Sequence, residues 1–185
     1  MKKGLALLSL AAFSFGSAQK GPLILNNYSK YDFEGYIIAS NSDGGCYPLV
    51  TSADPDLVKI PADSHMYNGH ELRYNDYQDQ FNNSLYPMAA WSVMLSATNT
   101  TTIPWNDPSL SLGGFISDNT KWAASKFAMY YPGTHNNAPD NFGGTVSIFS
   151  NCYNTTPNFT TPSGNMAEIF TIDDGVTLYT YIQLY

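Results

Sequence analysis

The segment MAAWSVMLSAT (residues 88–98) is the clearest strand pattern in the chain, and it decides the fold class. Its side chains alternate between two faces, with Trp91, Val93 and Leu95 on one and Ser92, Met94 and Ser96 on the other. A period of two is typical of a β-strand that is buried on one face. We therefore predict a central strand here.

Similar short patterns recur along the chain, separated by Gly, Pro and Asn. We expect a hairpin formed by residues 166–172 and 176–185, because residues 173–175 (DDG) are a Gly-containing turn. The other predicted strands are residues 23–25, 31–40, 46–51, 57–60, 114–117 and 145–152. We expect Gly35 to mark a β-bulge. The spacing predicts an all-β protein, an antiparallel β-sandwich of about 8–10 short strands.

Two segments have ambiguous patterns. Residues 121–131 (KWAASKFAMYY) fit a helix or a strand, and the alternation of Phe127, Met129 and Tyr131 favours a strand. Residues 71–86 (ELRYNDYQDQFNNSLY) are polar and aromatic, and we interpret them as a long loop with one helical turn. No repeat or linker divides the chain, so we predict one domain over residues 19–185.

The first 18 residues have the pattern of a cleavable signal peptide. Lys2 and Lys3 precede the apolar run GLALLSLAAFSF (residues 4–15), and small residues 16–18 offer a cleavage site before Gln19. The run is shorter than the ~20 residues that span a bilayer. The leader resembles those of secreted bacterial proteins. We expect export to the cell surface or the medium, with the periplasm as the alternative, and no membrane span in the mature chain.

The charge excludes several classes of partner. Charged residues are only 12% of the chain. Without Lys2 and Lys3, six basic residues face 15 acidic ones, which gives the mature segment a formal net charge of −9. This charge repels phosphate backbones and anionic membranes, so we expect no nucleic-acid partner.

The mature chain contains two cysteines, Cys46 and Cys152. An even pair in an exported protein predicts one disulfide. It would close a loop of about 107 residues, which the chain-entropy model values at up to ~4.7 kcal/mol. We expect it to join an early strand to a late one.

No motif for catalysis or cofactor binding is present. The sequence has no nucleophile elbow, phosphate loop or dinucleotide fingerprint, and no spacing typical of a zinc site. We predict no catalytic residue, no metal ligand and no cofactor. Calcium is the one alternative, with oxygen ligands from Asp54, Asp56 and Asp63 or from residues 136–140.

Aromatic residues are unusually frequent, at 15% of the chain. Tyr and Trp combine an apolar ring with a polar tip, which suits the stacking of a sugar ring beside amide and carboxylate groups. The candidate ligand-binding residues in predicted loops are Tyr67, Tyr74, Tyr77, Tyr86, Trp105, Asn106 and Asp107.

The terminal strands offer a different role. We expect residues 23–27 and 176–185 to be edge strands that pair with a neighbouring subunit by β-strand addition. The candidate assembly residues are Leu23, Ile24, Leu25, Tyr179, Tyr181 and Tyr185. The primary hypothesis is a non-catalytic structural or interaction protein whose partners are itself or other surface proteins. The alternatives are a module that binds an extracellular glycan and a small secreted hydrolase.

Overall fold

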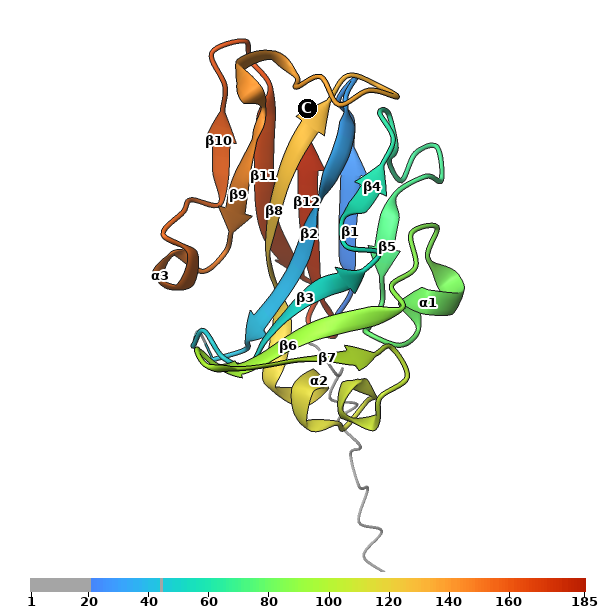
Figure 1. Ribbon diagram of the computed structural model, residues 1–185, viewed down its shortest axis with the longest axis vertical. Coiled ribbons are helices and arrows are strands. Elements are labelled where there is room, and N and C mark those ends of the chain that lie inside the picture. The colour runs from blue at the N-terminus through green and yellow to red at the C-terminus, as the bar shows by residue number, and fades with distance from the viewer. Residues whose placement is uncertain (1–20, 44) are drawn as a thin grey trace, which may run out of the picture.

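The structure, a computed structural model, describes residues 21–43 and 45–185. The predicted signal peptide lies outside these residues. Two sheets pack face to face around one core, and this confirms the predicted single all-β sandwich (Figure 1). The first sheet has the strand order β10–β11–β12–β1–β5. The second has the order β7–β6–β3–β2–β8–β9, with β4 also paired to β2.

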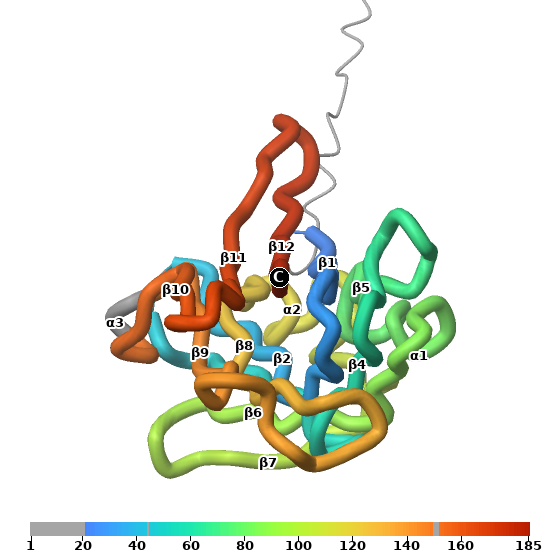
Figure 2. The backbone as a smooth tube through the Cα atoms, turned by 90° about the horizontal axis from the view of Figure 1, so that it is seen from above, coloured from blue at the N-terminus to red at the C-terminus, as the bar shows by residue number. Residues whose placement is uncertain are grey.

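The smaller sheet contains both ends of the described chain. Its strands are β1 (Leu23–Asn27), β5 (Leu72–Tyr74), β10 (Asn158–Thr160), β11 (Met166–Asp173) and β12 (Leu178–Leu184). The predicted hairpin is confirmed as β11 and β12, and it stands out from the body when the molecule is seen from above (Figure 2).

The prediction that the terminal strands are edges is wrong. β1 pairs with β12 in parallel on one side and with β5 on the other, and β12 lies between β11 and β1. Leu23, Ile24 and Leu25 are buried in this arrangement. Their backbone groups are used within the sheet, so these strands cannot add to a neighbouring subunit.

The larger sheet is organised around its two longest strands, β2 and β8. Its strands are β2 (Asp32–Asn41), β3 (Leu49–Asp54), β4 (Val58–Ile60), β6 (Ala90–Ser96), β7 (Asn99–Pro104), β8 (Thr120–Tyr130) and β9 (Gly143–Ser147). The strand favoured for residues 121–131 is confirmed as β8. Residues 88–98 are confirmed as β6, where Trp91 and Val93 are buried but Leu95 is exposed.

The predicted bulge at Gly35 is wrong, because the register of β2 against β8 shifts between Ile38 and Ala39 instead. Gly35 has a different role in the sheet. A Cβ at this position would lie 2.6 Å from the carbonyl oxygen of Lys126 and 2.6 Å from the Cβ of Phe127. Glycine therefore allows β2 and β8 to approach each other here.

Short helices connect the strands, and three local predictions need correction. The helices are α1 (Gln80–Asn83), η2 (Pro108–Leu110), α2 (Phe115–Asn119), η3 (Pro139–Asn141) and α3 (Ser150–Tyr153). Residues 71–86 contain the predicted helical turn as α1 but also strand β5. Residues 114–117 belong to the start of α2, because Gly114 precedes a turn that buries Ile116. Residues 145–152 leave the sheet after Ser147.

The disulfide between Cys46 and Cys152 is confirmed, with a Cα–Cα distance of 5.4 Å. It does not join two strands, as we expected. Cys46 lies in the loop between β2 and β3, and Cys152 lies in α3. The bond therefore fastens two connections at the same end of the larger sheet. No helix in residues 21–43 or 45–185 is long and apolar enough to cross a bilayer.

Candidate functional site

Two of the predicted ligand-binding rings belong to the core. Tyr74 and Tyr77 are both fully buried and pack against Trp91 and Trp122 at centroid distances of 5.1–5.9 Å. Their hydroxyls are used internally: Tyr74 donates to the carbonyl of Tyr86, and the Tyr77 hydroxyl lies 2.9 Å from Thr120 Oγ1. The expectation that these rings lie in exposed loops is wrong, and no face of either ring is free for a ligand.

The ring of Tyr86 instead lines an open and mostly apolar pocket of about 380 Å³. Its hydroxyl donates to the carbonyl of His70, which fixes the ring at the pocket wall. The other lining residues are Pro55, Leu57, Val58, Lys59, Pro87 and Met88. The lining contains no carboxylate, so this pocket lacks the paired acids of a glycosidase.

Trp105 forms a third location. Its ring stacks on Phe81 of α1, with centroids 4.6 Å apart and planes within 3° of parallel. Asn106 is exposed beside it. Asp107 caps η2, because its carboxylate accepts from the backbone nitrogen of Ser109 at 2.8 Å and from the Ser109 hydroxyl at 2.6 Å. These bonds from Ser109 lower the pKa of Asp107. The carboxylate thus has a structural role.

The outer face of the smaller sheet gathers more aromatic side chains than these three places. Along β12, Thr180, Ile182 and Leu184 are buried against the core. The intervening side chains must point the other way, because successive residues of a strand face opposite sides. The sheet therefore presents Tyr179, Tyr181 and Gln183 outward, with Tyr185 just beyond them.

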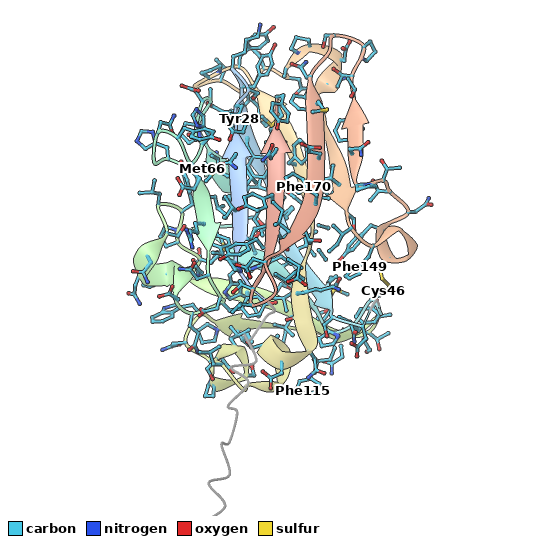
Figure 3. The ribbon with its side chains drawn as sticks, turned by 180° about the vertical axis from the view of Figure 1, so that it is seen from behind. Tyr28, Cys46, Met66, Phe115, Phe149 and Phe170 are labelled. Carbon is cyan, nitrogen blue, oxygen red and sulfur yellow. A yellow bond between two sulfur atoms is a disulfide. The ribbon has the colours of Figure 1, made fainter. Side chains whose placement is uncertain are left out.

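Neighbouring segments extend this line of rings. Phe170 of β11 is the register partner of Tyr181, and their rings stack at 5.4 Å. Tyr179 stacks on Tyr181 at 6.5 Å. Tyr28, which follows β1, stacks on Tyr185 at 5.5 Å. We call these five residues the aromatic row: Tyr28, Phe170, Tyr179, Tyr181 and Tyr185. Figure 3 shows Tyr28 and Phe170 on this face of the molecule.

Polar groups interrupt the aromatic row at its centre. Glu168 and Gln183 are register partners on β11 and β12, between the Phe170–Tyr181 pair and Tyr185. The Tyr185 hydroxyl donates to Gln183 Oε1. Partial burial raises the pKa of Tyr185, and Glu168 and Tyr28 raise it further. The hydroxyl is therefore neutral at neutral pH and can act as a hydrogen-bond donor.

A loop closes one end of the aromatic row. The ring of His65 stacks on Tyr28 at 4.6 Å, and Tyr67 lies 6.0 Å from His65 and is 83% exposed. Asp63 accepts from His65 Nε2 at 3.1 Å. Partial burial, and secondarily Tyr67, raises the pKa of Tyr28. Of the predicted loop aromatics, only Tyr67 thus lies beside the aromatic row.

The loop also covers polar atoms of the sheet below it. Asn26 is fully buried, and its Oδ1 accepts from the backbone nitrogen of Met66 at 2.9 Å. Its Nδ2 has no hydrogen-bond partner among the described residues, and neither do Glu71 Oε2 or His65 Nδ1. Asn26 follows Leu25 and Glu71 precedes Leu72 at the point where the pairing of β1 with β5 ends. This end of the row therefore combines aromatic rings with polar atoms that have spare hydrogen-bonding capacity.

Three of the calcium ligands suggested by the sequence have other local partners. Asp56 accepts from the Tyr36 hydroxyl at 3.2 Å, Asp63 pairs with His65, and Asp140 accepts from the backbone nitrogen of Ser163 at 2.7 Å. Across residues 21–43 and 45–185, no three His, Cys, Asp or Glu side chains come close enough to hold a metal ion.

Sequence reasoning missed Tyr28 and Phe170, and it assigned Tyr179, Tyr181 and Tyr185 to assembly rather than to ligand binding. The predicted hairpin held a usable signal, because a turn at residues 173–175 fixes the register that places Phe170 beside Tyr181. Tyr28 gave no such signal, since only the parallel pairing of β1 with β12 brings it to Tyr185. Comparisons of the chain with family models, curated proteins and solved structures find no significant match.

Proposed function

We propose that this protein is a non-catalytic binding protein that recognises an extended glycan through the aromatic row. The observation that carries the proposal is the row itself: five rings follow β12 and its neighbours on the outer face of the smaller sheet, with Glu168 and Gln183 among them. Ring surfaces suit the apolar C–H faces of sugars, and the amide and carboxylate suit their hydroxyls.

The length of the aromatic row favours a chain of sugars over a single one. Residues 179–185 of an extended strand span about 20 Å, at roughly 3.3 Å per residue. The tyrosine hydroxyls add hydrogen-bond donors along this length. The net negative charge of the protein favours a neutral glycan over an acidic one, because like charges repel.

Glycan-array binding followed by calorimetry tests this proposal. Tyr181 stacks on both Phe170 and Tyr179, so Tyr181→Ala should weaken binding about tenfold, the factor that 1.4 kcal/mol gives. Phe115→Ala is the matched control, because Phe115 is 61% exposed and lies on α2, away from the row (Figure 3). Retained binding in Tyr181→Ala, or equal losses in both variants, would contradict the proposal.

A protein partner is the second candidate function, in line with an interaction role. The stacked rings of the aromatic row cover part of one another's faces, and tyrosine edges with hydroxyls are common at protein interfaces. Cross-linking of the purified protein to surface proteins, lost in Tyr181→Ala but kept in Phe115→Ala, would support this candidate over the glycan.

A further inference from the structure

Strand β7 (Asn99–Pro104) ends the larger sheet with an exposed and uncharged edge. Five of its six residues are exposed, and only Ile103 packs partly against the core. Residues 88–106 contain no Asp, Glu, Lys or Arg, although the chain as a whole is acidic. Natural sheets protect their edges with charges, bulges or covering segments, because free backbone groups there pair with other strands.

The other edges among the described strands are short, covered or charged. β5 and β10 have three residues each. The outer side of β9 is covered by a following segment, because the backbone nitrogen of Ser147 donates to Thr156 at 3.2 Å and the Thr155 hydroxyl donates to the carbonyl of Thr145 at 2.5 Å. β11 continues beyond its pairing with β10, which ends at Glu168, but the exposed end of β11 carries the charged residue Asp173. Among the described strands, β7 is thus a long edge that is both open and uncharged.

The pairing of β6 with β7 identifies which backbone groups face outward. The backbone nitrogen of Trp105 donates to Ala89 at 2.9 Å, and Trp91 pairs with Ile103, Val93 with Thr101 and Ser92 with Thr102. In an antiparallel ladder, alternate residues bond to the partner strand. Ile103 and Thr101 therefore bond toward β6, and the N–H and C=O groups of Thr100 and Thr102 point away from the sheet.

We propose that β7 pairs antiparallel with β7 of a second copy of this chain, about a two-fold axis at Thr101. Thr100 then exchanges both backbone hydrogen bonds with the partner subunit's Thr102, and Thr102 does the same with the partner subunit's Thr100. The edge is self-complementary in this register, because the two outward-facing residues are symmetric about Thr101. Pro104, which has no N–H, lies outside the paired groups.

The charge distribution permits this contact despite the acidity of the subunit. Two chains of net negative charge repel each other, but the uncharged β6–β7 hairpin holds the acids away from the interface. Salt screens the remaining repulsion beyond a Debye length of about 8 Å at physiological ionic strength. Dimerisation should therefore strengthen as salt is added, opposite to an interface held by ion pairs.

The symmetry also limits the assembly to a dimer. A two-fold contact uses the same edge on both copies, so it closes after one pairing. Because β7 and the β11–β12 hairpin lie on opposite sides of the molecule (Figure 2), the contact leaves the aromatic row free. The inference does not depend on glycan binding.

Sedimentation velocity over a wide range of protein concentration tests the dimer. The protein should pass from monomer to dimer, and Thr102→Pro should remain a monomer at the highest concentration. Proline removes the outward N–H of Thr102 without breaking a bond to β6. Edge strands tolerate proline at such a position. Thr102→Ser is the matched control, because it keeps the N–H and should dimerise like the parent. A parent protein that stays monomeric, or a Thr102→Pro variant that still dimerises, would overturn the inference.

A cysteine pair tests the register. Thr101 faces the partner subunit's Thr101 in a non-hydrogen-bonded pair, where Cα atoms lie about 4.5 Å apart, within disulfide range. Thr101→Cys should oxidise to a covalent dimer. Thr100→Cys should not, because its own copy lies diagonally at about 7–8 Å. Equal cross-linking of both variants would contradict the register, and circular dichroism of each variant checks its folding.

Discussion

Leu25 of β1 lies beside Ile182 of β12 in parallel register, and both side chains are fully buried. The first and last strands of the described chain therefore lie side by side in the interior of one sheet. The pairing has two effects. It leaves neither terminal strand at the edge of a sheet, where it could pair with another subunit. It also places Tyr28 beside Tyr185 at one end of the aromatic row.

Ile182→Ala should lower the free energy of unfolding by about 2–5 kcal/mol, because it leaves a cavity between packed sheets. Gln183→Ala, one residue along on the outer face, should change it by less than about 0.5 kcal/mol. Urea unfolding followed by tryptophan fluorescence measures both. Similar small losses in the two variants would mean that β12 is not an interior strand.

Reduction of the Cys46–Cys152 disulfide should destabilise the fold by about 2–5 kcal/mol, because the bond closes a long loop and so restricts the unfolded chain. The double variant Cys46→Ser/Cys152→Ser should show the same loss. Thermal unfolding with and without a reducing agent measures it. The double variant is its own control, since the reducing agent should leave its unfolding temperature unchanged.

Asp107→Asn should remove a pH-dependent part of the stability. The bonds from Ser109 place the folded-state pKa of Asp107 below its unfolded value. The ionised carboxylate therefore stabilises the fold above the unfolded pKa of about 3.9, and this contribution is lost as the pH falls through the folded pKa. The difference in unfolding free energy between the parent and Asp107→Asn should be largest at neutral pH. A difference that grows on acidification would contradict the assignment.

Gly35→Ala should destabilise the protein by about 1–3 kcal/mol, because the added methyl would meet the backbone of Lys126 at 2.6 Å where β2 and β8 approach. Gly45→Ala is the control, since its Cβ would lie 3.4 Å or more from its neighbours. Chemical unfolding of the two variants should give a large shift for the first and little for the second.

The sequence predicted those elements whose determinants are local. The alternation in residues 88–98 corresponds to β6, the turn at residues 173–175 to the β11–β12 hairpin, and the pattern of residues 121–131 to β8. The prediction failed where a segment with the composition of a loop contributes side chains to the core. Tyr74 and Tyr77 lie in a polar segment that has the composition of a loop, yet both rings fill the centre of the core beside Trp91 and Trp122.

By itself, the sequence determined the sandwich class, the hairpin and the Cys46–Cys152 pair, because period-two alternation, turn residues and an even cysteine count act over short ranges or leave a single choice. Only the tertiary structure decided which strands are edges and which aromatic rings face outward. Both depend on pairing between segments far apart in the chain, such as β1 with β12, and such pairing is set by how the buried faces pack together. The many aromatic rings are thus divided between a core around Trp91 and an outer face along β12.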